Sequence, residues 1–365
     1  TVNWCTTAKT SPLTVASGNG YFINTTSGSI TVTLPSSPSA GDIVAFKDYA
    51  NTWDTNKVTV GRGGSKINGV CEDATLNTES QSVTLIYVDA TKGWQDIHDS
   101  TSNVTGAAFI SASGGDATIT CGNFKTHIFT GAGTFTVSSV AACAADNAVQ
   151  YLVVAGGGGA SGAPSPAGGT GGGGAGGFRM FSSAPGCNSP LNAPAGHTVT
   201  AQAYPIAVGA GGTGGFASSS PPQNGVSGSV STFSTISSAG GGFGGQRPCA
   251  PSDLGGSGGS GGGNGSYIAD PFIGPTAPSY GDSGPQSNTR YFAGGGGGGT
   301  GNDHPTAPGG TAGTGGAGGG GDGSSYTANA GSAGAANTGG GGGAVGSRTG
   351  KAGGSGIVMI RYRFQ

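Results

Sequence analysis

Blocks of consecutive glycine dominate the second half of this chain, and they constrain its fold more than any other feature. The chain has 365 residues and 82 glycines. Only 15 of these lie in residues 1–150, so 67 fall in the remaining 215 residues. Nine blocks stand out, at 156–159, 171–177, 209–215, 240–245, 255–265, 294–301, 309–323, 339–343 and 353–356. Any account of the fold must explain what these blocks build.

A flexible linker is the first possibility, because Gly- and Ser-rich sequence usually forms random coil. Here, however, two strongly apolar segments bracket the tract, YLVVA at 151–155 and GIVMIRYRF at 356–364. Isolated aromatic and aliphatic residues also recur between the blocks. Collagen requires glycine at every third position with abundant proline beside it, and cross-β silk requires long regular alternation. Neither pattern is present in the blocks.

A bundle of polyglycine-II rods is the third possibility, and the pattern favours it. This helix has three residues per turn, rises about 3.1 Å per residue and makes no internal hydrogen bonds. Its backbone groups therefore point outward, and without side chains neighbouring rods can approach and bond to one another. Glycine loses more conformational freedom on folding than other residues, so nearly every amide must find a partner. If 151–155 and 356–364 pair as strands, both ends of the bundle lie beside one sheet.

The first hundred residues have a different character. Segments 21–26, 29–35, 42–50, 56–62 and 82–89 alternate apolar and polar residues and are rich in Val, Ile and Thr, which is typical of strands. Gly-, Ser- and Pro-rich turns separate them. We therefore predict an all-β, β-sandwich-like module at 1–103, a β connector at 104–155 and a polyglycine-II domain at 156–365 closed by a C-terminal strand, with essentially no α-helix.

Six cysteines, at 5, 71, 121, 143, 187 and 249, form no CxxC pair and have no histidine at zinc-ligand spacing. We therefore expect no metal site. The even number favours disulfides in an oxidising location. Pairing within regions predicts Cys5–Cys71, Cys121–Cys143 and Cys187–Cys249, although six cysteines allow 15 connectivities. The alternative is that they are buried free thiols.

Two parts of the chain resemble known families. GYFINTTSGSITVTLPSSPSAGDIVAFKDYA with SVTLIYVDATKGWQDI, within residues 10–97, resembles a β module of phage tail-fibre and virion structural proteins, especially those of cyanophages. The order KTHIFTGAGTFTV, VQYLVVAGGGG, GGSGIVMIRY over 123–363 is similar to the glycine-rich domain family of phage fibres and bacterial surface proteins. These resemblances imply a virion or extracellular appendage, similar to long-tail-fibre adhesins, whose loops bind a host-surface glycan or outer-membrane protein. They also imply a homo-oligomer, a trimer or a polymer.

The longest segment between glycine blocks, 266–292, concentrates the candidate contact residues. Aromatic side chains supply a large contact area at low entropy cost, and the candidates are Tyr267, Phe272, Tyr280, Arg290, Tyr291 and Phe292. The alternative is that these rings cover the glycine bundle and exclude water. Further candidate loops are 216–228, 246–254 and 301–308.

Catalysis is not expected, because the four histidines lie in unrelated contexts and no activated nucleophile accompanies Asp303–His304. Asp253, Asp270 and Asp282 make only a weak case for a glycan-cleaving acid pair. We expect no cofactor.

The net charge of −2 provides no basic field for nucleic acid, and no apolar run is long enough to span a membrane. A structural subunit of a self-assembling extracellular filament or capsid fibre is the alternative to an adhesin.

Overall fold

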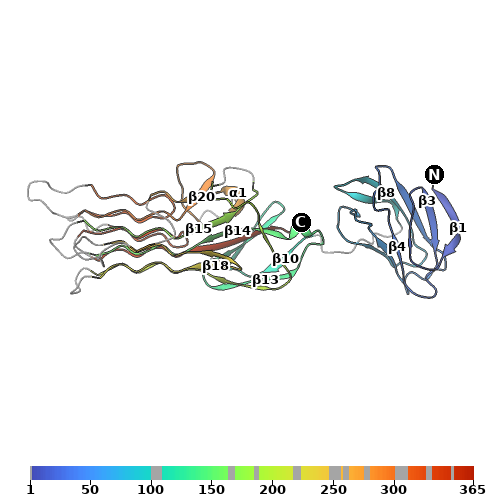
Figure 1. Cartoon of the computed structure of the whole chain (residues 1–365), viewed down its shortest axis with the longest axis horizontal. Helices are drawn as coiled ribbons and strands as arrows, with labels where there is room; N and C mark the ends of the chain where they lie inside the picture. Colours follow the sequence, from blue (N-terminus) through green and yellow to red (C-terminus); the bar gives the residue numbers. More distant parts are fainter. Residues whose placement is uncertain are drawn as a thin grey trace, which may run out of the picture. The chain divides into compact units, whose positions relative to one another are not determined.

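The computed structural model describes residues 2–99, 109–162, 169–184, 189–216, 223–245, 256–257, 263–274, 280–300, 311–325, 331–346 and 349–365. The chain divides into two compact units (Figure 1). Unit 1 comprises Thr1–Phe109 and Val140–Asn147, and unit 2 comprises Ile110–Ser139 and Ala148–Gln365. Within the predicted connector, residues 110–139 and 148–155 belong to unit 2, and residues 140–147 belong to unit 1.

Unit 1 is built from two sheets that share one core. The first sheet has the order β1-β3-β5-β8-β9 and the second the order β2-β4-β6-β7. The strands are β1 (Asn3–Lys9), β2 (Leu13–Thr14), β3 (Asn19–Ile23), β4 (Ile30–Thr33), β5 (Ile43–Asp48), β6 (Val58–Gly61), β7 (Ala74–Leu76), β8 (Ser82–Asp89) and β9 (Gly93–Asp99).

The chain of unit 1 alternates between its two sheets from β1 to β6, so that consecutive strands face each other across the core. As a result β1, β3 and β5 are mutually parallel, and so are β2, β4 and β6. Antiparallel strands β8 and β9 complete the first sheet and β7 completes the second. Inward side chains from both sheets, among them Ile23, Val32 and Phe46, form the core. The predicted all-β module is confirmed. It consists of two facing sheets in which most strands are parallel.

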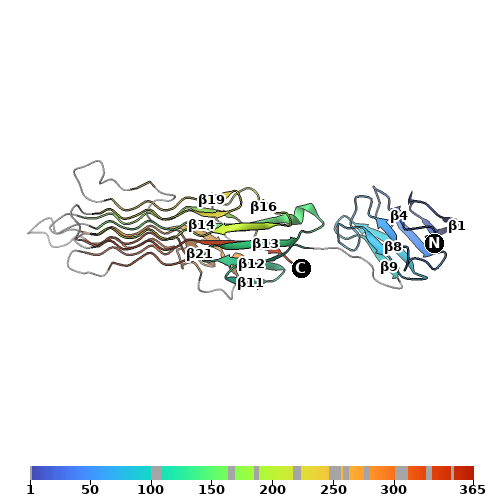
Figure 2. The same cartoon turned by 90° about the horizontal axis from the view of Figure 1, so that it is seen from below.

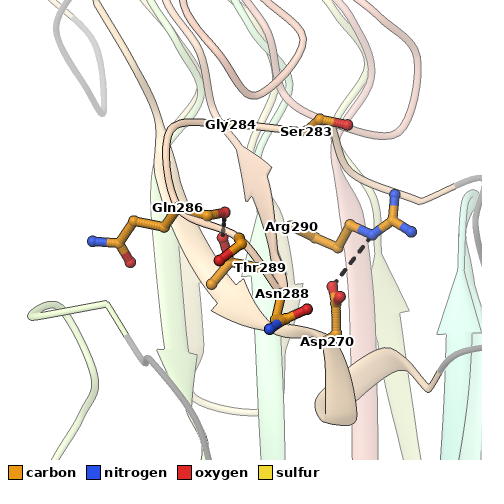
Figure 3. Close-up of a pocket in the computed structure, with 8 residues that line it drawn as sticks. Asp270, Ser283, Gly284, Gln286, Asn288, Thr289 and Arg290 are labelled. Carbon is orange, nitrogen blue, oxygen red and sulfur yellow. Dashed lines mark hydrogen bonds and ion pairs between the residues drawn. The ribbon is translucent and has the colours of Figure 1, made fainter.

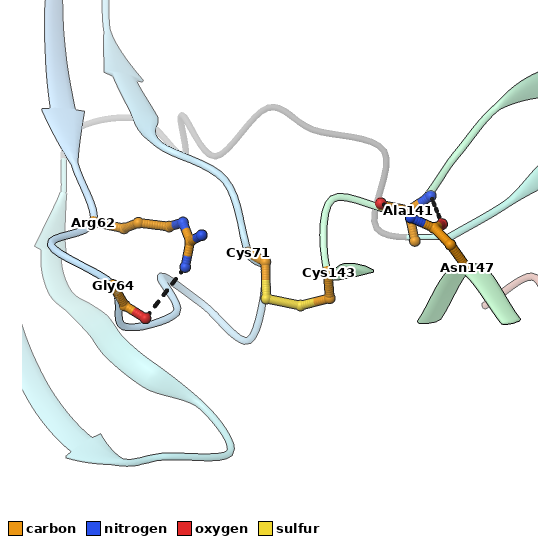
Figure 4. Close-up of a disulfide and its surroundings, with 6 residues drawn as sticks. All are labelled: Arg62, Gly64, Cys71, Ala141, Cys143 and Asn147. Carbon is orange, nitrogen blue, oxygen red and sulfur yellow. Dashed lines mark hydrogen bonds between the residues drawn. A yellow bond between two sulfur atoms is a disulfide. The ribbon is translucent and has the colours of Figure 1, made fainter. Parts of the chain in front are cut away.

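One disulfide links Cys71 to Cys143 (Figure 4), with a Cα–Cα distance of 5.0 Å that suits such a bond. Cys143 lies in the short segment between β13 and β14 that belongs to unit 1, where the Asn147 side chain bonds both the N–H and the C=O of Ala141. The 3-10 helix η1 (Ala144–Asn147) ends this segment.

The predicted pairings Cys5–Cys71 and Cys121–Cys143 are wrong, because Cys71 and Cys143 bond to each other and Cys5 and Cys121 are free. Nearness in sequence misled the prediction, since the fold brings a segment 72 residues further along the chain beside Cys71. The two free thiols are half-buried, as the alternative expected. Cys187 and Cys249 lie outside the described residues.

Unit 2 contains a five-stranded sheet, a six-stranded sheet and a two-stranded hairpin, β20-β21. The five-stranded sheet has the order β10-β13-β17-β18-β19; the six-stranded sheet runs β11-β12-β22-β14-β15, with β16 pairing β14. The strands are β10 (Ser111–Ser113), β11 (Ala117–Cys121), β12 (Phe124–Phe129), β13 (Gly133–Ser139), β14 (Ala148–Val154), β15 (Phe178–Phe181), β16 (His197–Thr198), β17 (Ala203–Ala207), β18 (Ser231–Phe233), β19 (Ile236–Ser238), β20 (Ser266–Ala269), β21 (Thr289–Phe292) and β22 (Ile357–Arg363).

The strand before the glycine tract and the strand after it are hydrogen-bonded neighbours. β22 pairs antiparallel with β14 over Gln150–Val154, and with β12 on its other side. This confirms the prediction that both ends of the bundle lie beside one sheet. The apolar residues of β14 and β22 are buried on both faces of the sheet. This burial explains why the two segments are continuous apolar runs and do not alternate apolar with polar residues.

Where the structure describes them, the glycine blocks form ordered rods joined by backbone hydrogen bonds, and these rods lie side by side in both Figures 1 and 2. Every N–H from Ala155 to Ser161 donates to a carbonyl of another segment, at N···O distances between 2.8 and 3.4 Å. Gly156 donates to Ser229, and Gly159, three residues on, donates to Val226 of the same segment. This period of three is that of polyglycine II.

The rod at 155–161 lies at the centre of the bundle. It donates hydrogen bonds to the rods at 171–177, 226–229 and 351–354, and it accepts hydrogen bonds from the rods at 212–215, 241–244 and 339–345. All its residues are buried. Because buried backbone groups must be paired, this full pairing stabilises a core made of backbone. The predicted ordered bundle is confirmed.

The rods pack too closely for side chains at the contact positions. A Cβ added to Gly158 would lie 2.0 Å from the Gly242 carbonyl oxygen, and one added to Gly156 would lie 2.0 Å from that of Ala210. Contacts this short require the backbones to separate. Glycine is therefore needed here for close approach rather than for flexibility.

Two rods lie outside the nine predicted blocks, at 225–229 and 331–335. Each has only two glycines, three residues apart: Gly225 and Gly228 in one, Gly331 and Gly334 in the other. An added Cβ at any of these four glycines would lie within 2.8 Å of a neighbouring atom. A rod at the edge of the bundle thus needs glycine only once per turn.

Candidate functional site

The first residue of the four-residue helix α1 (Asp270–Ile273), the turn before β21 and the first two residues of β21 line an open pocket with a volume of about 290 Å³ (Figure 3). Ala269 and Thr289 pair in register, so the helix and the turn before β21 leave the same end of the hairpin. The lining is entirely polar apart from one glycine: Asp270, Ser283, Gly284, Gln286, Ser287, Asn288, Thr289 and Arg290. We call this the Asp270–Arg290 pocket.

An ion pair crosses the pocket. The Arg290 Nε lies 3.4 Å from the Asp270 Oδ1, and both side chains are partly exposed. That carboxylate oxygen is itself buried but has no hydrogen bond within the described structure. The Asp270 N–H donates to the Asn288 carbonyl, and the Thr289 hydroxyl donates to that of Gln286. These two hydrogen bonds hold the backbone of the pocket in place.

Of the six contact residues predicted from the sequence, only Arg290 lines this pocket. Phe272, Phe292 and Tyr291 are buried, the first two completely. Phe272 and Phe292 pack with β14, β15 and β22 in one hydrophobic cluster. Phe272 and Phe292 therefore cover the six-stranded sheet, whereas the Tyr291 ring lies against Gly284 and Tyr267.

Tyr267 and Tyr280 are half-buried. The Tyr267 ring lies 5.3 Å from that of Tyr291, and Tyr280 packs against the same cluster as Phe292. The segment lies beside the six-stranded sheet, because the Thr126 hydroxyl on β12 donates to the Phe272 carbonyl. The segment therefore lies beside the sheet and not at the ends of the rods remote from it (Figure 1).

The pocket residues that sequence reasoning missed are the hydroxyl and amide side chains between Ser283 and Thr289. The search for aromatic rings passed over them. The run PQSNTR at 285–290, with five polar residues in a short turn and at the start of β21, was the available signal.

The other candidate loops fall wholly or partly outside the described residues. These include 217–222 and 246–254, with Asp253, and 301–308, with Asp303 and His304. Asp282 has a structural role, since its carboxylate accepts from the N–H groups of Gly318 and Gly319 at the turn between two rods.

Among the described residues, no group of three His, Cys, Asp or Glu side chains could hold a metal ion. In the same part of the chain, no helix has the length and apolar character needed to cross a membrane.

No curated protein matches the chain. The model of the glycine-rich domain family matches residues 129–363, which is more than half of the chain and runs from the end of β12 to the end of β22. The rods, the strands that bracket them and the pocket hairpin all lie within this span, and the chain belongs to the glycine-rich domain family.

Proposed function

We propose that this protein is a virion or extracellular appendage of the tail-fibre type that adheres to a surface glycan through the Asp270–Arg290 pocket. The observation that carries the proposal is the polar lining of a pocket held on a rigid hairpin. The virion context is supported by the resemblance of residues 10–97 to tail-fibre modules.

The chemistry of the lining favours a sugar over a protein partner. Sugar hydroxyls both donate and accept, so they suit a wall of hydroxyls, amides, a carboxylate and a guanidinium. Protein-binding hot spots are instead enriched in exposed Trp, Tyr and Arg at a desolvated centre, and two phenylalanines and Tyr291 of this segment are buried. About 290 Å³ is at the small end of ligand sites, which suits one or two sugar units.

The hairpin is well anchored for this role. Phe272 and Phe292 fix its inner face in the hydrophobic cluster, and Ala293, directly after β21, donates to Thr338 of another segment. Binding to a preorganised pocket loses little conformational entropy.

A glycan array probed with the full chain tests the proposal. Arg290→Ala and Asp270→Asn should each weaken binding to the recognised glycan at least tenfold. Arg179→Ala, which removes an exposed arginine from β15, is the matched control and should bind as the parent does. Equal binding by all three variants would exclude the pocket as the adhesive site.

The filament alternative has one observation in its favour. In the rod at 209–215, Gly209, Gly212 and Gly215 are buried and donate inward, whereas Ala210 and Thr213 are exposed. An outer rod of this kind resembles a sheet edge that another chain can extend. Sedimentation of the purified protein separates the two functions, because a filament subunit polymerises with concentration and an adhesin keeps a fixed stoichiometry.

A further inference from the structure

The outer face of the first sheet of unit 1 carries three aromatic rings in a row, Trp4, Phe22 and Tyr49. The Trp4 and Phe22 ring centres are 5.0 Å apart, and those of Phe22 and Tyr49 are 6.4 Å apart. Trp4 is 41% exposed and Tyr49 57% exposed. We call this set the aromatic row.

Strand alternation places the row on the solvent side. On β3, Tyr21 and Ile23 point into the core, so Phe22 between them points outward. The other two tryptophans of the chain, Trp53 and Trp94, are completely buried. Trp4 therefore differs from them in presenting a large apolar ring to water.

Gly20 determines how Trp4 lies. A Cβ at Gly20 would lie 2.6, 2.7 and 2.9 Å from the indole atoms Cδ2, Cε3 and Cε2. These atoms lie along and beside the fused bond of the indole, so the ring system lies flat on the Gly20 backbone. One face of the indole covers the sheet, and the opposite face is open.

A positive charge lies beside the row. Lys47 pairs in register with Phe22, and paired residues share a face of the sheet. The Lys47 Nζ donates to the Ser80 carbonyl at 2.5 Å, and in the part of the chain that the structure describes no carboxylate forms an ion pair with it. Ser82, which pairs with Lys47, adds a hydroxyl to the same face.

We propose that the aromatic row binds an anionic polysaccharide. The faces of aromatic rings carry partial negative charge and attract the slightly positive C–H groups that cover one face of a pyranose ring. Sugar rings of the chain stack on the exposed rings of Trp4 and Tyr49, and a carboxylate of the chain pairs with Lys47. The complementary charge selects an acidic polysaccharide over a neutral one. This site lies in unit 1 and does not depend on the Asp270–Arg290 pocket.

The fluorescence of the full-length protein provides a direct test, because Trp4 is exposed and the other tryptophans are buried. The protein is titrated with alginate and polygalacturonate, both polyuronates, and with dextran as the neutral polysaccharide. We expect the polyuronates to change tryptophan emission and to protect it from acrylamide quenching, while dextran binds at least tenfold more weakly.

Substitutions in the aromatic row and at Lys47 test whether these residues form the polyuronate site. Trp4→Ala and Lys47→Glu should each weaken polyuronate binding at least tenfold by calorimetry, and Trp4→Phe should retain part of it. Lys92→Glu, the same charge change at an exposed turn of unit 1, and Phe216→Ala, which removes an exposed ring from unit 2, are the matched controls.

Three results would overturn the proposal: no polyuronate binding by the parent protein, unchanged binding by a folded Trp4→Ala variant, or dextran binding as tight as alginate binding. Because Trp4 is exposed on an edge strand, the variant is expected to fold, and the near-ultraviolet circular dichroism of Trp53 and Trp94 checks this. Tyr49→Ala provides a second, independent truncation of the row.

Discussion

At the residue scale, single glycines in the bundle act by the absence of a side chain. The spacing of three residues between Gly225 and Gly228 and between Gly331 and Gly334 follows from three residues per turn, since one position per turn faces the nearest rod. This spacing can be read from the sequence, but it is less conspicuous than an uninterrupted glycine block. Two glycines three residues apart predict these outer rods, which the length of a glycine block does not.

Gly158→Ala should destabilise unit 2 by about 3 kcal/mol or more, because its Cβ would meet the Gly242 carbonyl and the surrounding rods cannot repack around it. The matched control is Gly131→Ala, where an added Cβ meets nothing within 4 Å and the change should be within about 0.5 kcal/mol. Denaturant unfolding measures both. Equal stability of the two variants would contradict the tight packing of the central rod.

We expect His127 to make the stability of unit 2 depend on pH. Its ring is buried between the two larger sheets, where its Nδ1 lies 2.6 Å from the Gly114 carbonyl and its Nε2 lies 3.1 Å from the Tyr362 hydroxyl. Burial lowers the pKa of His127 below its ordinary value of 6.5; the Gly114 carbonyl opposes this, and Lys125 adds to it.

The unfolded chain therefore binds the proton more readily than the folded one, and stability that is complete above pH 6.5 falls as the pH drops below it. We expect the free energy of unfolding to fall between pH 7 and pH 5, and to fall less in His127→Gln. His197, whose pKa is also lowered by burial, contributes in the same direction, so a double variant with His197→Gln should show the smallest fall. An unchanged pH profile in the double variant would contradict this assignment.

At the scale of elements, strands and rods are continuous with one another. β14 ends at Val154 and the central rod begins at Ala155; β22 begins at Ile357 directly after the last rod. The apolar sheet therefore fixes where the central rod begins and where the last rod ends. The sequence predicted these two strands and their pairing, but it did not predict β15 or β18, which are short and lie between glycine blocks.

The rods should differ in hydrogen exchange according to their place in the bundle. At 155–161 every amide donates to another rod and is buried, whereas at 209–215 every third amide donates inward and Ala210 and Thr213 are exposed. Exchange reports local opening, so we expect the central rod to be among the slowest-exchanging segments of the protein and the outer rod to exchange much faster. Mass spectrometry of peptic peptides measures this, and uniformly rapid exchange across 155–356 would contradict an ordered bundle.

At the scale of the whole molecule, the chain passes between the two units three times, and the Cys71–Cys143 bond closes a loop that includes β10 to β13. Sequence-based pairing within regions failed because it treated the chain as consecutive domains. The return of residues 140–147 to unit 1 carries Cys143 with it.

Removing the Cys71–Cys143 disulfide should lower the free energy of unfolding substantially. With a separation of 72 residues, the chain-entropy model gives a stabilisation of about 4 kcal/mol. Cys71→Ser and Cys143→Ser should each lower the free energy of unfolding of unit 1 by up to that amount, and a reducing agent should have the same effect on the parent protein. Cys5→Ser, which removes a free thiol, is the control. It should change neither the free energy of unfolding nor the decrease in that free energy when a reducing agent is added.

The sequence by itself determined the fold class, because strand alternation and glycine blocks are local patterns that leave few structures able to satisfy the backbone. It also determined the pairing of β14 with β22, since two apolar runs bracket one polar tract. Only the tertiary structure decided what depends on distant contacts: the disulfide partners, the burial of Phe272 and Phe292, and the gathering of Asp270 and Arg290 at one pocket. Composition indicates that aromatic rings are present in a segment, but whether a ring covers a core or faces water depends on which segments the fold packs against it.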